Sequence, residues 1–149
     1  MPMIYTPQGA CFEYRFKTTF EETNLVGNIY FANYVLWQGK CREMFLYETC
    51  PDVIKDINNG LSLITLDLSV QYISQLFAFD NVVMHMFLEA QSPSRLLMHF
   101  KYYKEENEAL VLVCEGTQAT ASMREENGKM VSVPFPESMF DVFEEYEIM

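Results

Sequence analysis

The side chains best suited to chemistry lie in one loop and in the segment that directly follows it. The loop holds the amide of Asn24, and the next segment holds the phenol of Tyr34 and the guanidinium of Arg42. The carboxylates of Glu43 and Glu48 follow closely. Amides and phenols can hydrogen-bond water or a carbonyl, a guanidinium can hold a carboxylate, and a carboxylate can act as a general base.

Residue type alone leaves an ordinary structural role open for each of these residues. An asparagine in a Thr-Asn loop commonly closes an Asx turn, and an arginine on a helix is usually solvated or paired with an acid. Tyr34 is also consistent with a core aromatic residue, and Thr65 with a residue that favours a strand.

Several other kinds of site are excluded or disfavoured. No Gly-x-Ser-x-Gly sequence occurs, and His85 and His99 lie in strand-like stretches without a Ser or Cys elbow beside them, which excludes an α/β-hydrolase triad. The four cysteines lack Cys-x-x-Cys spacing, so we expect reduced thiols in a cytoplasmic protein. We expect neither a metal nor a cofactor.

Hydrophobic periodicity predicts the elements that must position these residues. Residues 11–20 alternate apolar and polar side chains, as a strand does, and Gly27 gives conformational freedom to the loop 21–28. Apolar residues spaced by three and four then predict a helix over residues 33–49, with Asn33 as its N-cap and Pro51 ending it.

The rest of the chain reads as strands joined by short links. The predicted strands are residues 61–73, 81–91, 95–103, 109–123 and 130–133, and an amphipathic helix follows over residues 137–149. Short links favour antiparallel neighbours. We therefore expect a single α+β domain over residues 1–149, in which one long helix covers one face of a curved antiparallel sheet. The open edge and the other face favour self-association.

Composition limits the partners. Of 149 residues, 50% are hydrophobic, which is enough for a real core, and no apolar run could span a bilayer. The net charge of −11 argues against nucleic acid and against an anionic membrane surface. No signal peptide is visible at the N-terminus. Ten methionines suit a core or a tunnel that accepts a long apolar guest.

Residues 20–45 read FEETNLVGNIYFANYVLWQGKCREMF. This segment resembles the opening segment of hotdog-fold thioesterases of the 4-hydroxybenzoyl-CoA thioesterase type. The residues at the family's motif positions are Glu22, Thr23, Gly27, Tyr30, Asn33, Tyr34, Trp37 and Arg42. Because the similarity continues through residues 61–72, 115–116 and 134–136, it covers nearly the whole chain. It implies the hotdog fold, a curved antiparallel sheet wrapped around one long helix.

One position departs from the family pattern. Asn24 stands where the family usually has a catalytic aspartate, and an amide cannot act as a general base or a carboxylate nucleophile. With this asparagine the chain is most similar to thioesterases associated with enediyne polyketide synthases. That branch implies hydrolysis of a polyketide thioester held by an acyl carrier domain, release of a linear polyene and decarboxylation of the freed β-keto acid. It also implies a homo-oligomer, either a dimer or a tetramer.

The resemblance further implies roles for single residues. The backbone N–H of Phe31 would donate to the oxyanion, and the amide of Asn24 would position water or the thioester carbonyl. Arg42 would hold a carbonyl or carboxylate and stabilise an enolate. The substrate-binding candidates are Gly27, Tyr34, Thr65 and Trp37, and the walls of an apolar path would come from Phe31, Trp37, Met84, Met86, Met98 and neighbouring leucines.

Alternatives stay open at this point. The chain could be an acyl-CoA thioesterase, or a non-catalytic acyl-binding subunit that lost activity together with the acid at position 24. Glu43 or Glu48 could replace that acid as base or nucleophile, whereas Glu22 is expected to order the loop. A carrier domain is acidic and would need a basic cluster, for which the candidates are Arg15, Lys17, Lys101 and Lys104.

Overall fold

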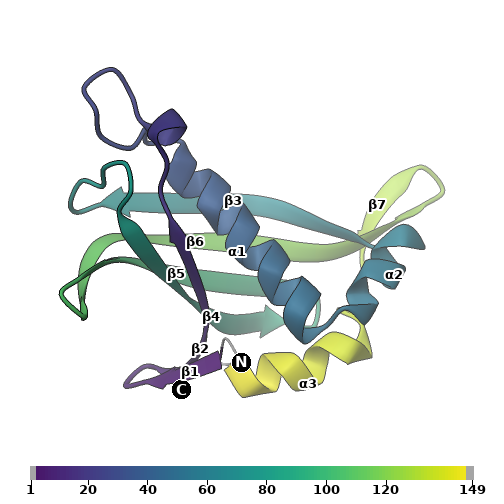
Figure 1. Cartoon of the computed structure of the whole chain (residues 1–149). Helices are drawn as coiled ribbons and strands as arrows, with labels where there is room; N and C mark the ends of the chain where they lie inside the picture. The colour runs from purple at the N-terminus through teal and green to yellow at the C-terminus, as the bar shows by residue number, and fades with distance from the viewer. Residues whose placement is uncertain (1–2, 147–149) are drawn as a thin grey trace.

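The computed structural model describes residues 3–146, which form a seven-stranded sheet and three α-helices (Figure 1). The strands are β1 (Met3–Thr6), β2 (Gly9–Lys17), β3 (Ser62–Tyr72), β4 (Asn81–Ser92), β5 (Arg95–Glu106), β6 (Ala109–Glu126) and β7 (Lys129–Ser132). The helices are α1 (Asn33–Thr49), α2 (Asp52–Asn58) and α3 (Glu137–Tyr146), and a short 3-10 helix, η1, spans Phe20–Glu22.

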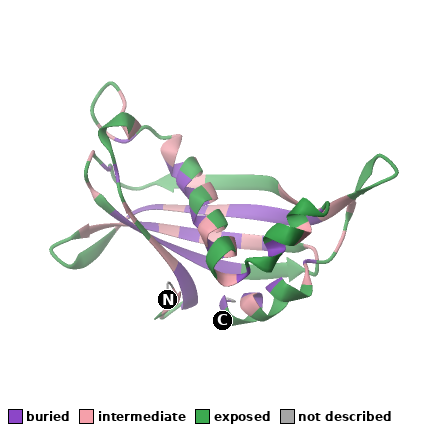
Figure 2. Ribbon diagram, turned by 45° about the vertical axis from the view of Figure 1, so that its right-hand side comes forward, coloured by how far each residue is buried: buried purple, intermediate pink, exposed green. Residues whose placement is uncertain are grey.

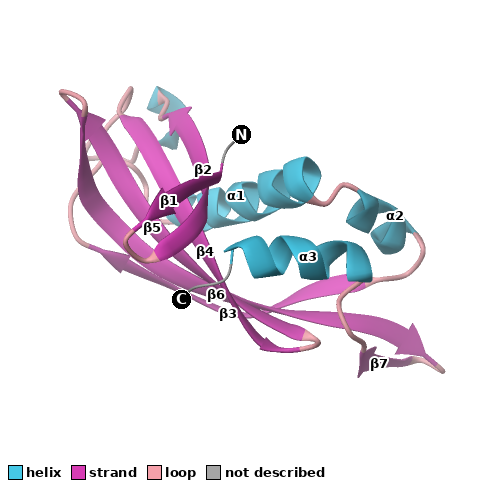
Figure 3. Ribbon diagram, turned by 90° about the horizontal axis from the view of Figure 1, so that it is seen from below, coloured by secondary structure: helices cyan, strands magenta, loops and turns pink. Residues whose placement is uncertain are grey.

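The sheet is curved, and α1 lies across its inner face (Figures 1 and 3). The strand order is β1-β2-β4-β5-β6-β3, every pairing is antiparallel, and β7 adds to β6. Hairpins join β4 to β5 and β5 to β6. The predicted fold class, a curved antiparallel sheet around one long helix, is confirmed.

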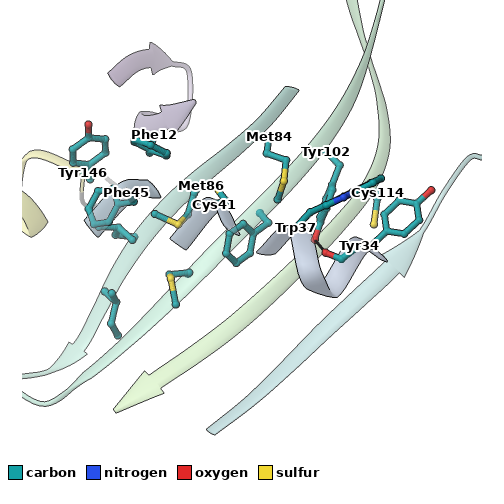
Figure 4. Close-up of a cluster of buried hydrophobic side chains, with 14 of the residues drawn as sticks. Phe12, Tyr34, Trp37, Cys41, Phe45, Met84, Met86, Tyr102, Cys114 and Tyr146 are labelled. Carbon is teal, nitrogen blue, oxygen red and sulfur yellow. Dashed lines mark hydrogen bonds between the residues drawn. The ribbon is translucent and has the colours of Figure 1, made fainter. Parts of the chain in front are cut away.

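The core fills the space between α1 and the inner face of the sheet (Figure 4). Trp37, Cys41 and Phe45 of α1 are at most 2% exposed. They pack in one cluster with Met84 and Met86 of β4, both fully buried. These two methionines are therefore core residues and do not form the wall of an open path.

α3 extends this core at the end of α1. Tyr146 packs edge-on against Phe45, and Phe143 does the same against Phe135. The predicted C-terminal helix is confirmed as far as Tyr146, and residues 147–149 lie outside the described residues. No helix within residues 3–146 is long and apolar enough to cross a bilayer.

β3 does not pair with β4, although the short link between them predicted antiparallel neighbours. It pairs with β6 at one edge of the sheet, and residues 73–80 cross over to β4. This link is tied to the loop before α1, because the N–H of Ile29 donates to the carbonyl of Leu76 at 2.8 Å and Leu76 is fully buried. A buried anchor in the link thus replaces the expected hairpin.

The helix ends were predicted with two errors. α1 begins at Asn33, but Asn33 is not its N-cap, because its Nδ2 donates to the carbonyl of Glu22 at 2.8 Å. α1 ends at Thr49, and Pro51 then opens α2, a helix that was not predicted. Proline suits a helix start because its missing N–H has no intrahelical partner there. β1 was also not predicted.

Glu22 organises the loop that leads into α1. Its Oε1 accepts hydrogen bonds from the backbone N–H and the hydroxyl of Thr19, at 2.8 and 3.0 Å. Its Oε2 accepts from Nε1 of Trp37 at 2.9 Å, and its carbonyl accepts from the backbone N–H of Tyr30 at 2.9 Å. One side chain thus fixes the loop to the helix, which is the loop-ordering role expected of this acid.

We predict that Glu22→Gln lowers the free energy of unfolding by about 1–3 kcal/mol. Both carboxylate oxygens of Glu22 accept hydrogen bonds from Thr19 or Trp37, and the NH₂ group of the variant would face one of these donors without being able to accept. Urea denaturation followed by fluorescence measures it, and Trp37, the only tryptophan, reports the loop contact directly. Glu21→Gln removes a charge from an exposed neighbour and should unfold as the wild type does. Equal stability of the two variants would contradict the organising role of Glu22.

Candidate active site

The N-terminal end of α1 presents free backbone donors. The N–H groups of Phe31 and Ala32 donate no hydrogen bond to another atom of residues 3–146. Amides before the first turn of a helix carry a partial positive charge, which suits an oxyanion. Phe31 borders a cavity of about 260 Å³ that Asn24, Tyr34 and Tyr72 also line.

Asn24 uses one end of its amide for the loop. Its Oδ1 accepts from the backbone N–H of Val26 at 3.0 Å, which is the Asx turn that the sequence left open. This bond fixes the orientation of the amide. The Nδ2 group makes no hydrogen bond within residues 3–146, so it is available to a ligand in the cavity.

Gly27 closes the same turn and does not line the cavity. Its N–H donates to the carbonyl of Asn24 at 3.1 Å, and its φ of 95° lies in the region that glycine favours. A Cβ at this position would meet open space, so the constraint is conformational.

Three aromatic residues support the cavity. Burial raises the pKa of Tyr34 to about 12, so its phenol stays protonated at neutral pH. The hydroxyl of Tyr72, which sequence analysis missed, donates to the carbonyl of Phe31 at 2.7 Å, and its ring packs edge-on against Tyr34. Trp37 is 1% exposed and bonded to Glu22, so in this structure it is a core residue that supports the loop.

A second group of polar residues lies further along α1. Nη1 of Arg42 donates to Oε1 of Gln118 at 2.8 Å, to the hydroxyl of Thr65 at 3.1 Å and to the hydroxyl of Thr120 at 3.2 Å. Arg42 makes no ion pair with any acid of residues 3–146. All the oxygens that it contacts are neutral.

The electrostatic surroundings of Arg42 differ from those of an ordinary surface arginine. Burial lowers the pKa of its guanidinium, while the charge of Glu43 acts in the opposite direction. Its Nε is buried and has no hydrogen-bond partner within the described chain. A partly desolvated arginine without an acidic partner attracts a nearby anionic group more strongly than a fully solvated arginine does.

Sequence analysis missed Gln118 and Thr120, although a signal existed. Four successive inward positions of β6 read Gly116, Gln118, Thr120 and Ser122, where a strand packed under a helix should be apolar. Gln118, Thr120 and Ser122 are at most 4% exposed. Polar residues at alternate positions of a buried strand are informative because each needs a partner.

The structure places the candidate residues in two groups. Asn24, Phe31 and Tyr34 share the cavity at the start of α1, whereas Arg42 and Thr65 lie about 14 Å further along the helix. An apolar cavity of about 20 Å³ adjoins Arg42, between α1, α3 and the sheet, and Met98 borders it. Glu43 and Glu48, the rival carboxylates, are exposed.

Known proteins resemble this chain in fold and in sequence. The structure of the dynemicin thioesterase, reported with induced-fit and allosteric effects upon polyene binding, is 34% identical with a TM-score of 0.89 and covers 93% of this chain and 99% of that chain. A curated protein of Aquifex aeolicus (strain VF5), named as an esterase, is 27% identical over 123 residues, which are 83% of this chain and 91% of the relative.

A more distant structure shows the fold alone. A variant of 4-hydroxybenzoyl-CoA thioesterase in complex with 4-hydroxybenzoyl-CoA has a TM-score of 0.77 at 9% identity, and the match covers 89% of this chain and 97% of that chain.

The profile of the thioesterase-like superfamily matches residues 18–143, which include every candidate site residue. With the curved sheet around α1, this match shows that the chain belongs to the thioesterase-like superfamily and has the hotdog fold.

Proposed function

We propose that this thioester hydrolase releases a polyketide chain from an acyl carrier domain as a linear polyene, with loss of CO₂ from the freed β-keto acid. The observation that carries the proposal is the half-buried cation of Arg42, whose only partners in residues 3–146 are neutral oxygens. The likeness to the dynemicin thioesterase supports a polyene as the substrate class.

Hydrolysis adds water across the bond between acyl carbon and sulfur. The water oxygen attacks the carbonyl carbon, and the electron pair of the C=O bond moves onto oxygen to form an oxyanion. The N–H of Phe31 and Nδ2 of Asn24 are donors suited to that charge. When the C–S bond breaks, the thiolate leaves with a proton from the attacking water, and the acyl group becomes a carboxylic acid.

Arg42 is suited to the product and to the second step. Its guanidinium can hold the carboxylate of a β-keto acid. When the bond to the carboxylate breaks, CO₂ leaves and the electron pair forms an enolate. The positive charge of Arg42 stabilises that enolate until water protonates its carbon to give the ketone.

The rival mechanism with a carboxylate receives no support from the geometry. The carboxylates of Glu43 and Glu48 are exposed and make no hydrogen bond within residues 3–146, whereas the carboxylate of Glu22 is bonded to the loop and to Trp37. Asn24 and the backbone N–H of Phe31 border the cavity, unlike these carboxylates. They can donate hydrogen bonds but take no part in proton transfer.

The expected basic cluster for the carrier is partly neutralised. Arg15 pairs with Glu13 at 2.8 Å and with Glu105 at 3.0 Å. Lys104 pairs with Asp80 and Glu106. Of the predicted cluster, Lys17 and Lys101 are left for the carrier domain.

A second copy of the chain would complete the site. β3 ends the sheet and is largely exposed along its length (Figure 2). Its side chains Leu66 and Leu68 are 43% and 41% exposed. If two copies pair antiparallel along this edge, their α1 helices run in opposite directions. The start of one helix would then approach the middle of the other, which brings the cavity of one protomer toward Arg42 of its partner.

We predict rapid single-turnover release of a β-ketoacyl chain from its carrier domain. Mass spectrometry should find the decarboxylated ketone as the product, and the same chain on CoA should react more slowly. Faster release from CoA would support the acyl-CoA thioesterase instead. A chain that stays bound and unhydrolysed would show that the protein is a non-catalytic acyl-binding subunit.

We predict that Arg42→Ala lowers turnover by about 10²–10³-fold, the usual cost of losing a group that stabilises developing charge. Its melting temperature should stay close to that of the wild type, because the variant also removes a half-buried cation without a charged partner. Arg95→Ala, which removes an exposed arginine, is the matched control. Wild-type turnover in Arg42→Ala would discredit the assigned site.

We predict that Asn24→Ala lowers turnover by about tenfold or more, because both the Asx turn and the free donor are lost. Asn24→Asp keeps the acceptor for Val26 and replaces only the donor, so it should not exceed the wild-type rate. Steady-state kinetics on a thioester substrate measures both variants. If Asn24→Asp were several-fold faster than the wild type, a carboxylate mechanism would be the better account.

A further inference from the structure

We infer that Gln118 and Gln38 are positioning residues that hold Arg42 in its catalytic orientation, an inference that rests on the proposed function. Gln118 of β6 and Gln38 of α1 are 4% and 0% exposed. Nε2 of Gln118 donates to Oε1 of Gln38 at 3.3 Å, and Oε1 of Gln118 accepts from Arg42 at 2.8 Å. The two amides thus link Arg42 to the backbone of the sheet.

The direction of this hydrogen-bond chain is fixed at its far end. The carbonyl of Ser69 can only accept, so the group of Gln38 that contacts it at 3.1 Å is the NH₂ donor. Oε1 of Gln38 therefore faces Gln118 and requires a donor there. Gln118 must present its NH₂ group to Gln38, which leaves its Oε1 for Arg42.

The backbone next to this chain is shaped to accommodate it. Gly116 lies directly below Gln38, and a Cβ at this position would stand 2.5 Å from Nε2 of Gln38 and 2.5 Å from the carbonyl oxygen of Ser69. Only a glycine leaves room for the bond between Gln38 and Ser69. The glycine, the two amides and the carbonyl therefore form one arrangement that ends at Arg42.

Neutrality is what makes this arrangement useful to a catalyst. A carboxylate in place of the Gln118 amide would hold Arg42 as firmly but would also neutralise its charge. An amide orients the guanidinium and leaves the full positive charge for an anionic substrate group. The hydroxyls of Thr65 and Thr120 add contacts of the same neutral kind.

The test is Gln118→Glu, which keeps the size and the acceptor oxygen and adds a negative charge beside Arg42. With a β-ketoacyl thioester of N-acetylcysteamine as substrate, kcat/KM at pH 8 should fall by about 100-fold relative to the wild type. The introduced carboxylate stays ionised beside the guanidinium, so the loss should appear in kcat and persist at pH 6, whereas the melting temperature should change little. Gln91→Glu, which adds the same charge at an exposed position of β4, should keep the wild-type rate.

Should Gln118→Glu fail to fold, Gln118→Met tests the same point without charge. It removes the acceptor for Arg42 and the donor for Gln38, so the melting temperature should fall modestly, and kcat of the folded variant should fall by about tenfold. An unchanged kcat in both variants, or a loss that only follows stability, would overturn the positioning role. If Arg42→Ala is inactive while Gln118→Glu equals the wild type, the positioning role fails and the proposed function stands. Full activity of Arg42→Ala would overturn both assignments.

Discussion

The half-buried cation of Arg42, held between α1 and the sheet with neutral oxygens as its only partners in the described chain, is the interaction on which the proposed site depends. Taking Arg42 out of water is costly, and an acid beside it would have lowered that cost. The chain instead surrounds the guanidinium with an amide and two hydroxyls. These orient the group, and its charge stays available to a substrate. The proposed mechanism, which has no catalytic aspartate, depends on a fixed positive charge of this kind.

The fold positions this charge because one helix contacts both the loop that precedes it and the sheet. At its N-terminal end, α1 meets the loop that Glu22 organises, and the first amides of the helix stay free. Near its middle, α1 faces the polar stripe of β6 through Gln38 and Arg42. β3 ends the sheet as an open edge, where the second copy of the proposed function would complete the site.

Much of the fold followed from local patterns in the sequence. The bounds of α1 were predicted correctly, since its apolar residues recur with the period of a helix over four turns. β4, β5 and β6 were found because each is a strand-like stretch bounded by turn-forming residues, although β5 and β6 extend beyond the predicted ends. The predicted partner of β3 was wrong. Leu76, the buried anchor in the link between β3 and β4, redirects the chain but adds nothing to the hydrophobic periodicity.

The sequence by itself determined the α1 helix, the Thr-Asn loop before it and the absence of an acid at position 24, because these depend on residue type and on near neighbours. Only the tertiary structure decided that Asn24 and Arg42 lie in separate groups and that two glutamines hold the arginine. The bonds from Gln118 to Arg42 and to Gln38 join residues 76 and 80 positions apart. Contacts at that separation arise when strands pair, and no local pattern records which buried amide will meet which cation.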